Sequence, residues 1–186
     1  MKKYNVLADD IARVLVSEEE LCVLTDKVAA QIDEDVKGSG KELLLVCVLK
    51  GSLMFTADLA RKITTPLKLD FIKASSYGGG TVSSGNLRIS LDCGEYDWEN
   101  KFVVIVEDII DSGNTLSYLK RLLSSRQPKS IKICTLLDKP SRRVVKFEPD
   151  IALFTIPDHF VIGYGLDCGE YYRNLPYIAE YNEKGE

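Results

Sequence analysis

The sequence VVIVEDIIDSGNTL (residues 103–116) joins an apolar strand to a turn that can bind a phosphate. Residues 102–106 form a continuous apolar run, which is typical of a strand covered on both faces of a parallel sheet. The Ser-Gly-Asn-Thr turn leads into a helix, and the free amides at a helix start bind anions. Three acids, Glu107, Asp108 and Asp111, lie beside this expected site. They either cap a solvated helix or bind the hydroxyls and metal of a ligand that also carries a phosphate.

Apolar strands and amphipathic helices alternate on both sides of this stretch. We expect strands over residues 43–49, 67–74, 102–106, 131–137 and 151–156. We expect helices from the capping box at Ser17 to Val36, over residues 52–63, and from Thr115 to the stop at Pro128. The alternation predicts an α/β fold with a parallel sheet, whose ligands bind beyond the carboxyl ends of the strands. Lys50-Gly51, residues 107–115 and Lys139 all follow such ends.

The composition is that of an ordinary globular protein. The 186 residues are 45% hydrophobic, which is enough for one well-buried core. A net charge of −4 argues against binding along a nucleic-acid backbone, because that requires a basic surface. The five cysteines are widely spaced and include no CxxC pair, which indicates reduced thiols. The sequence contains no signal peptide and no apolar run of membrane-spanning length, so we expect a cytoplasmic protein.

Several common enzyme motifs are excluded. Residues 80–85 have the first half of a Walker A spacing, but Asn86-Leu87 stands where Lys-Ser/Thr is required. The glycines near Gly165 are one residue out of step with the dinucleotide-binding fingerprint. His159 is the single histidine and no GxSxG is present, which excludes a multi-histidine metal centre and a nucleophile elbow.

The opening stretch resembles the phosphoribosyl pyrophosphate motif of the type I phosphoribosyltransferases, and EDIIDSGNT is similar to their hypoxanthine-guanine members. Further matches occur in the same order: Leu49-Lys50-Gly51, Ser76-Tyr77, Leu136-Leu-Asp-Lys139, residues 157–167 (PDHFVIGYGLD) and Glu170-Tyr-Tyr-Arg173. The resemblance covers about residues 43–173. It implies one domain with a parallel-sheet core flanked by helices, a small hood subdomain and a flexible lid loop. The core would span about 38–150, the hood about 1–16 and 151–186, and the lid about 75–90.

The resemblance implies an enzyme of purine salvage. It would transfer the 5-phosphoribosyl group from phosphoribosyl pyrophosphate to N9 of hypoxanthine and/or guanine, giving IMP and/or GMP plus pyrophosphate. It implies Mg²⁺ as cofactor and a homodimer or homotetramer, with no nucleic-acid or membrane partner. Adenine lacks the O6 that Lys139 would address, and orotate would need a different hood. The alternative that is not an enzyme is a regulator with the same fold that binds RNA or DNA. The net negative charge argues against it.

The resemblance also implies a role for each matching residue. Asp111 would be the general base at purine N7. Ribose and magnesium would be bound by Glu107 and Asp108, with Asp167 as a further magnesium ligand. The 5'-phosphate would be bound by Asp111, Ser112, Gly113, Asn114 and Thr115. Pyrophosphate would be bound by Lys50, Gly51 and Arg173, and in this family the peptide before Lys50 can be cis. The purine would be bound by Lys139, Phe160, Val161 and Asp167.

The Gly- and Ser-rich residues 75–86 have two interpretations. Composition alone favours a flexible linker. The resemblance instead makes them a lid, with Ser76 and Tyr77 at its base, which would shield a cationic sugar from water. Two departures from the family pattern concern Asn114 and His159, where some relatives carry basic residues. They leave the phosphate affinity and the preference among hypoxanthine, guanine and xanthine open.

Overall fold

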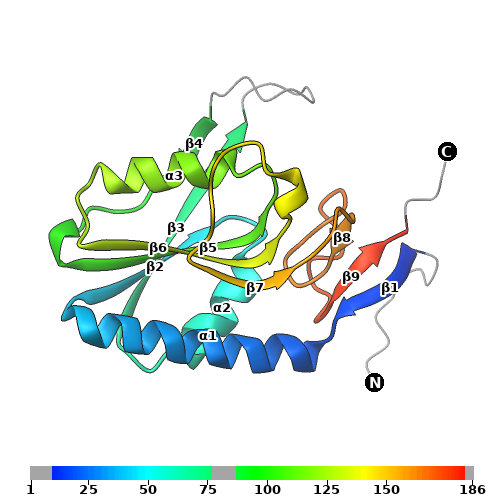
Figure 1. Cartoon of the computed structure of the whole chain (residues 1–186), viewed down its shortest axis with the longest axis horizontal. Helices are drawn as coiled ribbons and strands as arrows, with labels where there is room; N and C mark the ends of the chain where they lie inside the picture. The colour runs from blue at the N-terminus through cyan, green and yellow to red at the C-terminus, as the bar shows by residue number, and fades with distance from the viewer. Residues whose placement is uncertain (1–9, 77–86, 183–186) are drawn as a thin grey trace.

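A six-stranded sheet forms the centre of the protein. The computed structural model describes residues 10–76 and 87–182 (Figure 1). The strand order is β4-β3-β2-β5-β6-β7. The strands are β2 (Glu42–Val48), β3 (Leu67–Ser76), β4 (Leu87–Leu91), β5 (Lys101–Ile110), β6 (Ser130–Asp138) and β7 (Ile151–Thr155). All neighbouring pairs are parallel except β3 with β4. The predicted α/β fold with a mostly parallel sheet is therefore confirmed.

Three helices cover the two faces of this sheet. They are α1 (Glu18–Ser39), α2 (Leu53–Lys62) and α3 (Asn114–Ser124), and short 3-10 turns form η2 (Trp98–Asn100) and η3 (Pro140–Arg142). Figure 1 shows α3 on one face and α1 with α2 on the other. Side chains of β5 alternate accordingly, because Val104 and Val106 pack with the α1 and α2 cluster whereas Val103 and Ile105 pack with α3. This two-sided burial explains the continuous apolar run.

The start of α1 confirms the predicted capping box. The Glu20 amide donates to Ser17 Oγ at 3.2 Å, and the Ser17 amide donates to Glu20 Oε2 at 2.9 Å. Both bonds use amides that a helix start would otherwise leave without a partner. The hydrogen bonds that the Glu20 carboxylate accepts from the Ser17 amide and the Ser17 hydroxyl lower the pKa of Glu20. This helix end is therefore complete without a ligand.

A second, smaller sheet packs at one end of the main sheet. It contains β1 (Ile11–Val16), β8 (Val161–Ile162) and β9 (Ile178–Tyr181) in the antiparallel order β1-β9-β8. We call residues 156–181 together with β1 the hood. Strand β7 pairs with β6 in the main sheet, so the expected hood range of 151–186 includes one strand of that sheet.

Two strand boundaries differ from the sequence-based expectation. Strand β5 continues to Ile110, so Glu107 and Asp108 lie within the strand and not in the turn after it. Of the expected lid, residues 75–76 end β3, residues 87–90 belong to β4, and 77–86 with Tyr77 lie outside the described residues. Strand β4 forms because Ile89 packs into the α3-side core while β4 pairs with β3. No helix in the described ranges is long and apolar enough to span a membrane.

Candidate active site

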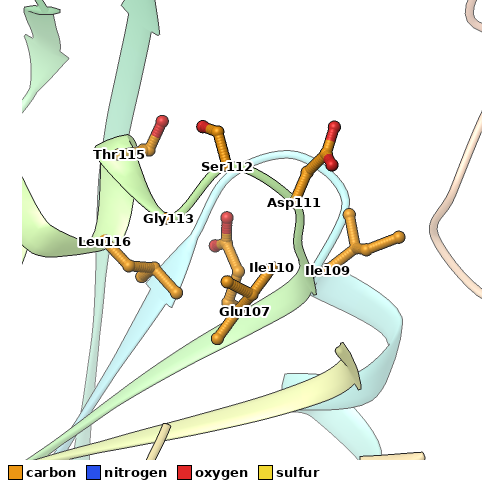
Figure 2. Close-up of a pocket in the computed structure, with 8 residues that line it drawn as sticks. All are labelled: Glu107, Ile109, Ile110, Asp111, Ser112, Gly113, Thr115 and Leu116. Atoms are coloured by element: carbon orange, nitrogen blue, oxygen red, sulfur yellow. The ribbon is translucent and has the colours of Figure 1, made fainter. Parts of the chain in front are cut away.

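The turn between β5 and α3 surrounds a small cavity. The cavity holds about 90 Å³ and is lined by the end of β5, the turn at Asp111–Gly113 and the first residues of α3. One water occupies about 30 Å³ in the liquid, so the cavity has room for a phosphate-sized group. Figure 2 shows the hydroxyls of Ser112 and Thr115 projecting from the same side of the turn, with the Glu107 carboxylate below it.

The first turn of α3 has no side-chain cap. Its N-cap is Gly113, which has no side chain to cap the helix, and the Asn114 amide donates a long hydrogen bond of 3.4 Å to Ser112 Oγ. The amides of this turn lie beside the cavity with the positive end of the helix dipole behind them. Gly113 has φ 82°, and a Cβ at this position would lie 2.9 Å from Arg143 Cδ and 3.0 Å from Val145 Cγ2. Both the backbone conformation and the packing thus require glycine.

Glu107 and Asp108 occupy different surroundings because consecutive strand residues point to opposite faces. Glu107 lies under the turn between β5 and α3, where Oε2 is buried without a hydrogen-bond partner in the described structure. Burial, reinforced by the charge of Asp108, raises the pKa of Glu107 well above its ordinary value. Burial also raises the pKa of Asp108 to about 6, although amides and Arg173 oppose this shift. The surroundings of both carboxyls therefore favour the protonated, neutral form over the charged form.

Asp108 lies directly against the turn that follows β2. The Leu49–Lys50 peptide in this turn is cis. A Cβ at Gly51 would overlap Asp108 Oδ2, and a Cβ at Gly165 would overlap the carbonyl oxygen of Gly51. The hood and the β2 turn therefore meet through backbone atoms, and the Asp108 carboxylate packs directly on Gly51, so neither glycine position has space for a side chain.

Glu170 ties the hood to the same turn, and Arg173 lies beside it. Arg173 Nη1 donates to the Gly165 carbonyl at 2.7 Å, and Arg173 Nη2 lies 2.8 Å from Asp167 Oδ1. Lys50 Nζ lies 2.8 Å from Glu170 Oε2. The structure thus brings together Lys50, Gly51 and Arg173, as expected for a pyrophosphate site, with Asp167 beside them. The backbone in this part of the hood has positive φ at Tyr164, Glu170 and Tyr172, a conformation that non-glycine residues rarely adopt.

The expected purine-binding residues lie at the junction of β6 and the hood. Lys139 Nζ donates to the His159 carbonyl at 2.5 Å. The side chain of Phe160 is 44% exposed and its ring lies 5.6 Å from that of Tyr181, so one aromatic face is available for stacking. Val161 is a buried residue of β8, which leaves its backbone as the part that a ligand can address.

Comparison with known proteins agrees with this geometry. A family model for the phosphoribosyl transferase domain matches residues 7–168. The hypoxanthine-guanine phosphoribosyltransferase of Streptococcus pneumoniae is 48% identical over 179 residues, which cover 96% of this chain and 98% of the relative. The hypoxanthine phosphoribosyltransferase of Salmonella typhimurium is 48% identical over 167 residues, or 90% and 93% of the two chains. This chain belongs to the hypoxanthine-guanine phosphoribosyltransferase family.

A solved structure of the family extends the agreement to three dimensions. The crystal structure of a hypoxanthine phosphoribosyltransferase from Staphylococcus aureus matches with a TM-score of 0.90 at 45% identity, covering 97% of each chain. The type I phosphoribosyltransferase fold is therefore shown for nearly the whole chain, including the hood.

Sequence reasoning missed two arginines beside the phosphate turn of this phosphoribosyltransferase. Arg142 Nε donates to Asp111 Oδ1 at 3.0 Å, and Arg143 Nη1 donates to the Asp111 carbonyl at 2.7 Å. Arg143 also bonds to the buried Asp138. The available signal was the Arg142-Arg143 pair shortly after Lys139, at the carboxyl end of β6. Its contacts to Asp111 cross 31 and 32 residues of sequence, which spacing alone does not reveal.

The family's magnesium has partial support from this donor set. Among residues 10–76 and 87–182, no three His, Cys, Asp or Glu side chains gather into a metal site of their own. Burial is the main cause of the raised pKa of Asp108, the charge of Asp167 adds to it, and carboxylate oxygens of this kind suit magnesium. Magnesium usually takes one or two protein carboxylates and completes its shell with substrate phosphates and water. The residues therefore fit a metal that arrives with a diphosphate.

Proposed function

We propose that this chain transfers the 5-phosphoribosyl group of phosphoribosyl pyrophosphate to N9 of hypoxanthine or guanine, forming IMP or GMP and pyrophosphate, with Asp111 as the general base. The relatives named above carry this activity in their names. The observation that carries the residue assignment is the start of α3 without an N-cap side chain, which lines the same cavity as Glu107 and Asp111.

The 5'-phosphate binds in the cavity at the start of α3. The amides of the turn, the hydroxyls of Ser112 and Thr115 and the helix dipole supply the attraction, assisted by Asn114. Among the residues that the structure describes, no Lys or Arg side chain lines the cavity. Amides and hydroxyls thus bind the phosphate, which leaves the acids below the turn free to accept hydrogen bonds from ribose hydroxyls.

The pyrophosphate end of the substrate binds between the β2 turn and the hood. Lys50 and Arg173 provide positive charge, and the backbone at Gly51 provides hydrogen bonds. Glu107, Asp108 and Asp167 would hold magnesium together with substrate oxygens. When bound, magnesium neutralises the charge that develops on departing pyrophosphate. A positive ligand also relieves the cost of ionising the buried Asp108.

The purine binds between the turn and the hood. Lys139 donates to O6, Phe160 stacks on the ring and the backbone of Val161 supplies hydrogen bonds to its edge, beside Asp167. Asp111 accepts the proton from N7 as N9 forms the new bond to ribose. Such general base catalysis typically contributes a factor of about 10²–10⁴. Ser76 and Tyr77 belong to a lid that excludes water from the cationic sugar.

We further propose that the protein acts in the cytoplasm as a homodimer or homotetramer. The assembly is supported by family membership, and the cytoplasmic location by the free, widely spaced cysteines. Sedimentation analysis of the purified protein tests the assembly, and a monomer at micromolar concentration would contradict it.

The test of the residue assignment is pyrophosphate release with hypoxanthine, guanine, xanthine and adenine. We expect turnover of the 6-oxopurines and a loss of about 10²–10⁴-fold in Asp111→Asn. Glu148→Gln, which alters an exposed acid outside the site, serves as the matched control. Wild-type rates in Asp111→Asn would refute the base assignment. RNA binding without any turnover would favour the regulator alternative.

A further inference from the structure

Four charged side chains form a continuous row between the proposed base and the proposed O6 donor. Arg142 Nε lies 3.0 Å from Asp111 Oδ1, and Arg142 Nη1 lies 3.3 Å from Asp158 Oδ2. Asp158 Oδ1 lies 3.6 Å from Lys139 Nζ. The row thus begins at the phosphate turn, passes through η3 and the hood, and ends on the residue after β6. Neither Arg142 nor Asp158 has a role in the function proposed above.

The two ends of this row correspond to neighbouring atoms on one edge of the substrate. N7 and O6 of a 6-oxopurine lie side by side, so a base at N7 and a donor at O6 must be spaced to match them. Asp111 and Lys139 come from different segments, and Asp111 lies on a turn. Their relative position is therefore not determined by a single rigid element. Arg142 and Asp158 connect them.

We propose that Arg142 and Asp158 are positioning residues for the 6-oxopurine edge: Arg142 orients the carboxylate of Asp111, and Asp158 orients the ammonium of Lys139. This inference rests on the proposed function of Asp111 and Lys139. The opposite signs along the row alternate, so each member attracts its neighbours. A second bond supports each end, from Arg143 to the Asp111 backbone and from Lys139 to the His159 carbonyl.

The exposure of the row predicts that it contributes to catalysis more than to folding. The side chains of Asp111, Arg142 and Asp158 are 49%, 52% and 51% exposed. Ion pairs with this exposure contribute little to the free energy of unfolding, because water screens them. A bound purine would remove part of this water and strengthen the same charges. Substitutions can therefore disturb the site without unfolding the protein.

The experiment measures steady-state kinetics of Arg142→Gln, Arg142→Lys and Asp158→Asn. We expect kcat/KM for hypoxanthine to fall about ten- to hundredfold in Arg142→Gln and Asp158→Asn, because misplacement of a reacting group can cost a factor of about 10². KM for phosphoribosyl pyrophosphate should change less than twofold. Arg142→Lys should recover part of the loss, since it keeps the charge but not the fork geometry. Lys146→Gln, an exposed cation of the same segment, is the matched control.

A double-mutant cycle separates positioning from a general loss of structure. If Arg142 acts through Asp111, the pair Arg142→Gln/Asp111→Asn should be no slower than Asp111→Asn alone. Additive losses would overturn the proposal, as would a fall in melting temperature that parallels the loss of activity. A lower KM for hypoxanthine in Arg142→Gln would also overturn it, because Arg142 would then compete with the purine.

The same measurements separate the proposed role of Asp111 as base from the proposed role of Arg142 as a positioning residue. Wild-type rates in Asp111→Asn would mean that the base in the proposed function is wrong. An impaired Asp111→Asn beside an unimpaired Arg142→Gln would leave the base in place and refute only the positioning role.

Discussion

Two helix starts in this protein each have acids nearby, but the acids act differently. At α1, Glu18, Glu19 and Glu20 follow Ser17, and Glu20 returns a hydrogen bond to the chain, which lowers its pKa. Before α3, Glu107 lies buried below a turn without an N-cap side chain and the half-buried Asp108 lies on the opposite face of β5, and the pKa values of both are raised. The first arrangement satisfies the helix start by itself. The second leaves amides and carboxyls to be satisfied by a ligand, at a cost in stability.

The largest effect expected from this comparison of helix starts comes from closing the α3 site. Gly113→Ala should lower kcat/KM for phosphoribosyl pyrophosphate by about 10²–10³-fold, because the left-handed backbone is strained by about 1–2 kcal/mol and the new Cβ displaces the turn from the phosphate. The reaction rate is measured together with the thermal shift caused by phosphoribosyl pyrophosphate.

Gly38→Ala offers a matched control for this change. Position 38 lies near the end of α1, and a Cβ there would meet nothing within 4 Å. Activity should stay at the wild-type level. A Gly113→Ala protein that keeps its affinity for phosphoribosyl pyrophosphate would show that the α3 start is not the phosphate site.

Asp108→Asn should stabilise the ligand-free protein while it impairs the enzyme. With its pKa raised to about 6, Asp108 keeps a proton that the unfolded chain releases above about pH 4, so stability falls as pH rises toward 6. Removing the charge should add about 1–3 kcal/mol to the free energy of unfolding at pH 8, and little at pH 4. Urea unfolding at both pH values measures this gain. A loss of stability at pH 8 would contradict the burial argument.

Ser17→Ala tests the self-satisfied helix start. Loss of an N-cap hydroxyl typically costs about 1 kcal/mol, so the midpoint of urea unfolding should fall while kcat/KM stays within twofold of wild type. The control is Ser112→Ala, which we expect to reverse the pattern by lowering activity with little change in stability. A catalytic defect in Ser17→Ala would show that the two helix starts are not independent.

The smallest expected effect is the pH dependence of the α1 cap. Because the pKa of Glu20 is lowered, its contribution is present above about pH 4.5 and is lost as pH falls through the folded-state pKa. Glu20→Gln should therefore be slightly less stable than wild type at pH 8 and equal to it at low pH. This sign is opposite to that of Asp108→Asn, and the same sign for both would erase the distinction between the two sites.

The sequence predicted the core elements because burial leaves a local pattern. The run at residues 102–106 indicated a two-sided strand, and the Ser17 capping box indicated where α1 begins. The extension of β5 through Glu107 and Asp108 was not predicted, because the acids interrupt the apolar run, although Ile109-Ile110 continued it. Strand β4 was missed since an edge strand has a short and half-exposed pattern.

Contiguous motifs predicted most of the candidate site. They did not predict the contacts between segments that lie far apart in the sequence. The row from Asp111 through Arg142 and Asp158 to Lys139 joins three segments, and Arg142 and Asp158 taken alone are ordinary surface charges. The opposite surroundings of Glu107 and Asp108 follow from strand geometry, once the strand is known to include them. Tertiary structure supplied these facts, because no spacing rule links charges so distant along the chain.

The contact of Gly165 with the Gly51 carbonyl restricts how this enzyme can change over evolution. No side chain fits at Gly51 or Gly165, between the hood, the β2 turn and Asp108. A substitution at either glycine would therefore disrupt the site and could not change its base preference. New base preferences must therefore arise at side chains next to the proposed base and O6 donor, as at Arg142 and Asp158. Directed evolution libraries should leave the two glycines fixed and diversify those side chains.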